Sequence, residues 1–125
     1  MKKSYDSTQR TRDKMSKELI SSEIELNALL SLPVVKLQNL DFLINRKNKT
    51  IDLKISFNNH VSLIFVNIQG IELTDQFNYG NIEDGYYIDI HEVSSFQLEH
   101  ILWEFNEYEN NSLHFFCERI YYESL

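Results

Sequence analysis

The chain has 125 residues, of which 42% are hydrophobic and 13% aromatic, with three glycines, one proline and one cysteine. This composition fits one globular domain and excludes collagen-like, low-complexity and disulfide-stapled chains. The net charge of −7 is uneven: residues 1–17 carry six bases and two acids, 18–71 five of each, and 72–125 twelve acids and one base.

The first segments predict a tail and a helix. Residues 1–12 are polar with alternating charge and are expected to form a flexible basic tail, followed by a single globular domain over 13–125. From Asp13, apolar residues recur at intervals of three and four, which predicts an amphipathic helix that ends before Pro33. No apolar signal or membrane-spanning run follows the N-terminal lysines, so we expect a cytoplasmic protein.

The middle of the chain predicts extended structure. Alternation of apolar and polar residues indicates strands over 35–44 and, most clearly, 50–57, with polar turns at 46–49 and 58–60. The stretch 61–73 is apolar on both faces, which is typical of a covered strand, and Gly70 is expected to mark a bulge or bend in it.

The acidic half predicts further strands. A loop over 74–85 precedes a strand over 86–93, and another strand is indicated over 113–122. Residues 96–109 fit either a helix or a strand, and their aromatic density favours the strand. The expected fold is an α+β domain, a mostly antiparallel β-sheet with an N-terminal amphipathic helix.

Two histidine–acid pairs, His91-Glu92 and Glu99-His100, raise the question of a metal or catalytic site. They do not have the H-E-x-x-H register, although residues 91 and 100 could approach across a turn, joined by His60 or His114. We interpret them as polar edges around a turn. The sequence has no phosphate-binding or nucleophile motif, so we predict no enzyme activity, no cofactor and no metal site.

Cys117 is the single cysteine and lies in an aromatic strand, where a free cysteine is usually a small buried hydrophobe. His114 is three residues away and would face the opposite side of that strand. The pair therefore does not predict a thiol nucleophile.

Charge and aromatic content favour a protein-binding function. Tyrosine and tryptophan anchor interfaces, and acidic groups around them steer a basic partner. The same acidity argues against nucleic acid and membranes, despite the basic tail and the "RKNK" turn. Partner contacts are expected from the exposed members of one set: Glu83, Asp84, Tyr86, Asp89, Glu92, Glu99, Glu104, Glu107 and Tyr108.

The segments "LKISF", "HVSLIFVNIQGIEL", "GYYIDIHEV" and "LHFFCERIYYESL" together resemble the small acidic bacterial immunity-type proteins that neutralise polymorphic toxins, and their uncharacterised β-rich relatives. The resemblance covers roughly residues 50–125. It implies a non-enzymatic, antitoxin-like inhibitor that covers a toxin's active site with acidic and aromatic groups. Two alternatives stay open: a structural subunit that forms a homodimer through its helix or a strand edge, and a metal-dependent enzyme that uses His91 and His100.

Overall fold

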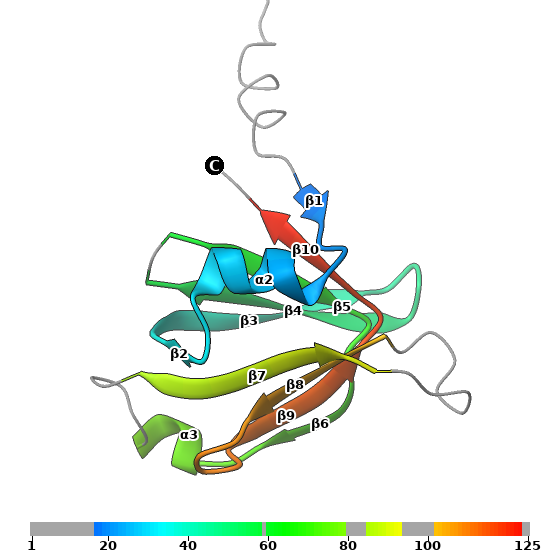
Figure 1. Ribbon diagram of the computed structural model, residues 1–125. Helices are drawn as coiled ribbons and strands as arrows, with labels where there is room; N and C mark the ends of the chain where they lie inside the picture. Colours follow the sequence, from blue (N-terminus) through cyan, green and yellow to red (C-terminus); the bar gives the residue numbers. More distant parts are fainter. Residues whose placement is uncertain (1–16, 59, 80–84, 94–101, 124–125) are drawn as a thin grey trace, which may run out of the picture.

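The computed structural model describes residues 17–58, 60–79, 85–93 and 102–123 as a mostly antiparallel β-structure (Figure 1). Five strands form sheet A in the order β1-β10-β5-β4-β3, and five form sheet B in the order β2-β7-β8-β9-β6. All strand pairings between them are antiparallel. The expectation of a mostly antiparallel sheet is therefore confirmed. The predicted tail over 1–12 lies outside the described residues.

The strand bounds follow the sequence pattern closely in the middle of the chain. Sheet A consists of β1 (Lys17–Leu19), β3 (Leu37–Asn45), β4 (Thr50–Phe57), β5 (Ser62–Val66) and β10 (Arg119–Glu123). Sheet B consists of β2 (Val34–Val35), β6 (Gln69–Leu73), β7 (Tyr86–Glu92), β8 (Trp103–Glu107) and β9 (Leu113–Cys117). The turn between β3 and β4 lies at the predicted position, 46–49.

The two sheets are joined where the chain continues from one into the other. Residue Lys36 links β2 to β3, Asn67 and Ile68 link β5 to β6, and Glu118 links β9 to β10. Strands β2 and β3, β5 and β6, and β9 and β10 are thus consecutive along the chain but belong to different sheets. The two sheets share one hydrophobic core.

The helix is shorter than the sequence pattern predicted. Helix α2 spans Glu23–Leu30, and the expected N-terminal helix over 13–32 is wrong because Lys17–Leu19 pairs with β10 as strand β1. Ser22 is the last extended residue before α2, and its side chain accepts a hydrogen bond from the Glu25 backbone N–H. A serine that caps a helix in this way fixes where the helix begins. Within the described residues, no helix has the length and apolar character needed to cross a membrane.

Strands form in the stretch 61–73, which was expected to be a covered strand, and in the undecided stretch 96–109. The expectation of a covered strand is confirmed for β5 but is wrong for β6, which is exposed throughout. The apolar stretch 61–73 forms β5 and β6 with a bend at Asn67 and a shift of register between Gln69 and Glu72, which confirms an irregularity at Gly70. The strand interpretation of 96–109 is confirmed for β8, while residues 94–101 lie outside the described part of the chain.

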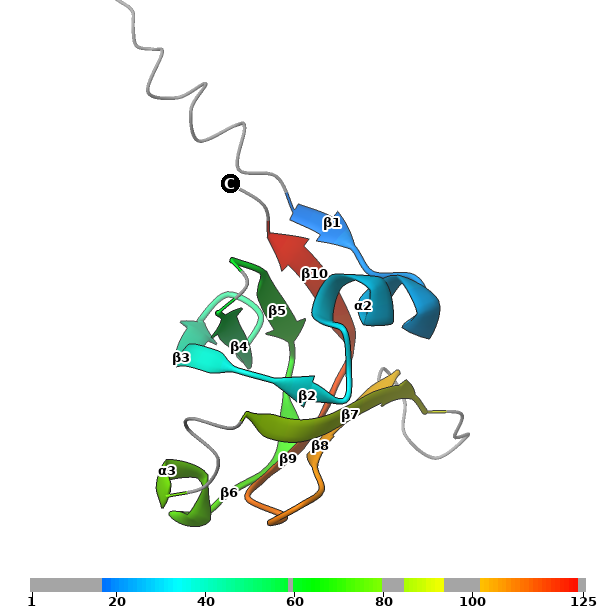
Figure 2. The ribbon, with the colours of Figure 1, turned by 60° about the vertical axis from the view of Figure 1, so that its left-hand side comes forward.

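The core lies between the sheets. Phe65 of sheet A contacts Phe105 and Phe115 of sheet B edge-to-face, with ring centroids 5.5 and 5.1 Å apart. Helix α2 lies beside β10, on the side of the molecule where β2 and β7 pair (Figures 1 and 2). It contributes Leu26 and Leu30 to the same core, so the helix covers this side of the two sheets.

Candidate polar face and groove

The outward side of sheet B carries a row of polar residues that we call the polar face: Asp89, His91, Glu104, Asn106 and His114. Their core-facing neighbours alternate with them along β7, β8 and β9, as the period of a strand requires. The strand register sets His91 opposite Glu104, and Asp89 opposite Asn106. Residues far apart in the sequence therefore meet on one surface.

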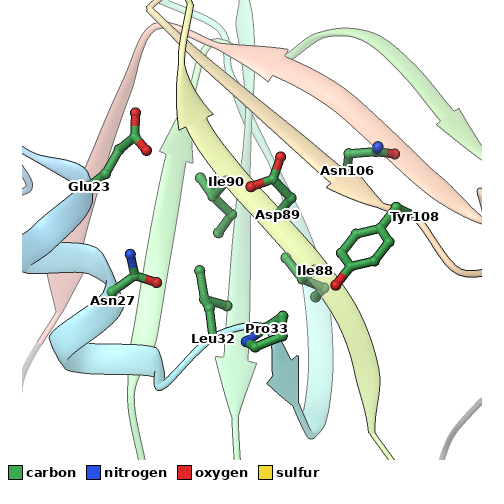
Figure 3. A pocket seen from close by; sticks show the side chains of 9 residues that line it. All are labelled: Glu23, Asn27, Leu32, Pro33, Ile88, Asp89, Ile90, Asn106 and Tyr108. Atoms are coloured by element: carbon green, nitrogen blue, oxygen red, sulfur yellow. The ribbon is translucent and has the colours of Figure 1, made fainter.

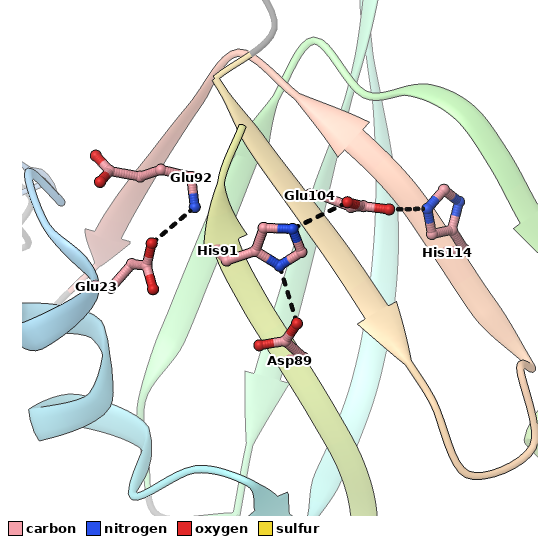
Figure 4. A network of polar contacts seen from close by, with 6 residues as sticks. All are labelled: Glu23, Asp89, His91, Glu92, Glu104 and His114. Carbon is pink, nitrogen blue, oxygen red and sulfur yellow. Dashed lines mark hydrogen bonds and ion pairs between the residues drawn. The ribbon is translucent and has the colours of Figure 1, made fainter. Parts of the chain in front are cut away.

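Glu104 connects the two histidines of the polar face (Figure 4). One carboxylate oxygen lies 3.0 Å from His91 Nε2, and the other lies 2.6 Å from His114 Nε2. The second nitrogen of His114, Nδ1, is buried and has no hydrogen-bond partner among the described residues, and a Glu72 carboxylate oxygen is 3.8 Å away. Because a neutral imidazole carries one N–H, His114 can donate to Glu104 through Nε2 and leave Nδ1 unprotonated.

His91 lies between two carboxylates. Its Nδ1 is 2.9 Å from Asp89 Oδ2, and its Nε2 faces Glu104. Ionised carboxylates only accept hydrogen bonds, so a neutral ring can donate to one of them and only the doubly protonated ring can donate to both. The contact with His91 holds the Asp89 carboxylate in place on the polar face.

A groove adjoins the polar face where α2 approaches β7 (Figure 3). Its volume is about 480 Å³, and none of its lining residues is basic. Glu23 and Asn27 extend from α2 on one side, and Asp89 extends from β7 on the other. The remaining lining residues are Leu32, Pro33, Ile88, Ile90, Asn106 and Tyr108.

Aromatic and polar contacts hold the walls of the groove. Glu23 accepts a hydrogen bond from the Glu92 backbone N–H, at 3.1 Å, which ties the start of α2 to the end of β7. Tyr108 is 45% exposed, and its ring meets the Tyr87 ring edge-to-face at 6.1 Å. A half-exposed aromatic ring in a groove that also contains carboxylates suits a cationic group.

Two of the predicted partner-binding residues are not available to a partner. Tyr86 is buried, and its hydroxyl donates to the Phe77 carbonyl at 2.9 Å. Glu107 is completely buried, because its carboxylate accepts hydrogen bonds from the turn between β8 and β9. Both are therefore removed from the exposed set.

The other predicted residues divide into two groups. Asp89, Glu104 and Tyr108 lie together on the polar face or at the groove, and Glu92 is exposed at the end of β7. Glu83, Asp84 and Glu99 lie outside the described residues, as does His100. The structure also adds Glu23 and Asn27, which the sequence did not single out because a helical pattern gives no indication of which strand a helix will face.

The structure gives no support for a nucleophilic or metal centre in the part of the chain it describes. Cys117 is buried, and burial followed by the negative charge of Glu118 raises the pKa of its thiol well above the ordinary value. His114 points to the opposite side of β9, as expected. Among the described residues, no group of three or more histidine, cysteine, aspartate or glutamate side chains is arranged to hold a metal ion.

No protein-family model matches this sequence, and neither does any curated protein or solved structure. The resemblance to immunity-type proteins stays a prediction from the sequence.

Proposed function

We propose that this protein is a non-enzymatic module that binds a basic protein partner through the polar face and the adjoining groove. One observation carries the proposal: Glu23 and Asp89 border a groove that has no basic lining residue, and Glu104 lies beside it. Because opposite charges attract over about 10 Å at moderate salt, such a surface draws in lysine and arginine side chains.

The composition of this surface supports binding. Tyr87 and Tyr108 give it partly exposed aromatic area, which anchors interfaces at a low cost in side-chain entropy. The acidic C-terminal half, with twelve acids and one base over 72–125, strengthens the field around it. In its most specific form, which is supported by the sequence resemblance, the module is a cytoplasmic immunity or antitoxin-like inhibitor of a basic toxin.

The test compares capture of partners by the protein and by charge variants. We expect one basic protein from the source lysate to bind at low salt and to be released at high salt. The double variant Asp89→Lys with Glu92→Lys should weaken its binding about tenfold or more, since like charges oppose association. Isothermal titration with the purified partner measures the change.

The matched control is Asp41→Lys with Asp75→Lys. Both positions are exposed, and this pair changes the net charge equally, away from the polar face. An equal loss of partner affinity in the two double variants would show that binding depends only on the net charge of the protein. Unchanged binding in the first would contradict the placement of the interface.

A second candidate function is self-assembly through β3, an edge strand of sheet A. Its outer half leaves large apolar side chains accessible: Ile44 is 72%, Phe42 47% and Ile51, opposite Ile44 on β4, 45% exposed. An exposed apolar edge strand is a site at which a second copy can add. Helix α2 is a weaker basis for a dimer than the predicted longer helix was.

A further inference from the structure

The edge of β7 that faces the groove is only partly paired. Its ladder with β2 covers Tyr86 and Tyr87, after which the Ile88 N–H donates to the Pro33 carbonyl at 2.8 Å. Four residues further along β7, the Glu92 N–H donates to Glu23. Ile90 lies between these points, and within the described part of the chain no strand pairs with it on this side.

The backbone of Ile90 therefore faces the groove. The odd-numbered residues of β7 face β8, because Tyr87 accepts from the Tyr108 N–H and Val93 donates to the Leu102 carbonyl. In an antiparallel ladder the alternate residues point their N–H and C=O groups to the other side. A polar group that enters the groove can therefore hydrogen-bond to the backbone of Ile90.

The lining favours a hydrogen-bond donor with positive charge and an apolar stem. Carboxylates lie on both sides, at Glu23 and Asp89, and the Ile90 carbonyl is a further acceptor. The half-buried Leu32 offers an apolar surface. The volume of about 480 Å³ lies within the usual range of ligand pockets, so the groove has room for a long side chain.

We propose that this groove receives an arginine side chain of the basic partner, an inference that rests on the proposed function and names its recognition element. A guanidinium presents five donors in a planar fork, so it can reach acceptors on both walls while its methylene stem packs on Leu32. Its flat face can stack on the ring of Tyr108. A lysine ammonium donates from a single point and matches this spread of acceptors less well.

The groove can be tested without knowing the partner. The probe is N-acetyl-arginine methylamide, titrated into the ¹⁵N-labelled protein and followed by NMR. We expect saturable shifts of the Ile90 amide and the Asn27 and Asn106 side-chain amides. The lysine analogue should bind about fivefold more weakly, and the uncharged citrulline analogue should give no saturable shift. Equal binding of the arginine and lysine probes, or shifts spread over the whole acidic surface, would overturn the proposal.

A variant that fills the groove without changing charge separates shape from general acidity. Asn27→Trp places a large ring in the groove from an exposed helical position, and Ala28→Trp is the control on the same helix outside the lining. We expect Asn27→Trp to abolish saturable binding of the probe and to weaken a captured partner about tenfold, and Ala28→Trp to change neither.

The outcomes distinguish this inference from the proposed function. If a basic partner is lost with Asp89→Lys and Glu92→Lys but binds Asn27→Trp normally, the polar face is the interface and the arginine pocket is wrong. If the probe binds in the groove but no basic protein is captured at any salt concentration, the pocket stands and the proposed partner class fails.

Discussion

Glu107 shows how one residue can be misjudged from its type. It is a carboxylate at a completely buried position, yet its oxygens accept hydrogen bonds from the backbone of Glu109, Asn110 and Ser112 and from the Ser112 hydroxyl at 2.6 Å. Burial alone would raise the pKa of Glu107, but these hydrogen bonds together outweigh it and lower the pKa below the ordinary 4.5. The residue organises the turn between β8 and β9.

Replacing Glu107 by glutamine should therefore destabilise the protein in a pH-dependent way. At pH 7 we expect Glu107→Gln to lose about 1–3 kcal/mol, because a strong acceptor of several N–H and O–H groups is replaced. A lowered folded-state pKa contributes stability that is present above pH 4.5 and is lost as the pH falls through the folded value. The difference in the free energy of unfolding between wild type and Glu107→Gln should therefore become smaller at acidic pH.

Urea unfolding at pH 7 and at several pH values below 4.5 measures this difference. The control is Asp75→Asn, at an exposed position, which should leave the free energy of unfolding within about 0.5 kcal/mol of wild type. A Glu107→Gln protein as stable as wild type at pH 7 would contradict the role given to the carboxylate.

Among the elements, β3 was predicted from the sequence pattern, but it carries exposed apolar side chains that the pattern places on the buried face. The strand was expected and spans Leu37–Asn45, paired on one side with β4. It contains no lysine or proline, two of the residues by which edge strands usually avoid pairing with other chains. Phe42 and Ile44 face the same way as the buried Leu53, but they remain exposed.

If a second copy covers this strand, placing a charge there should separate the copies. We expect the wild-type protein to sediment as a dimer at about 100 μM and Ile44→Lys to sediment as a monomer, because a buried unpaired charge opposes the interface. Ile24→Lys is the matched control on α2, at an isoleucine that is 82% exposed, and it should remain dimeric. A wild-type monomer at this concentration would contradict self-assembly through β3.

At the scale of the whole molecule, one core joins two sheets, and the described chain passes from one sheet to the other four times. Phe65 is central to it, since the ring is fully buried and contacts two rings of the opposite sheet. The polar face and the apolar end of β3 are therefore on sheets that share this core. Destabilising the core should affect both surfaces.

Phe65→Ala should cost about 3–5 kcal/mol, the usual loss for a large buried aromatic side chain that leaves a cavity. Phe42→Ala makes the same substitution at a ring that is 47% exposed, and we expect a loss of less than about 1 kcal/mol. Chemical unfolding of both variants at low protein concentration provides the comparison. Similar losses at the two positions would show that Phe65 does not lie at the centre of the core.

The sequence by itself determined most of the strands in the middle of the chain, because alternation with a period of two reflects burial on one face of a strand. That is how the strand over 50–57 and the opposite orientations of His114 and Cys117 were predicted correctly. The helix was predicted too long, because apolar spacing cannot show that Lys17–Leu19 will gain hydrogen bonds from β10. The tertiary structure alone decided that His91 meets Glu104, that Glu107 is enclosed by its own turn and that Glu23 faces Asp89 across a groove. These contacts depend on strand register and on where the helix packs, and both are set by long-range pairing that no local pattern in one sequence encodes.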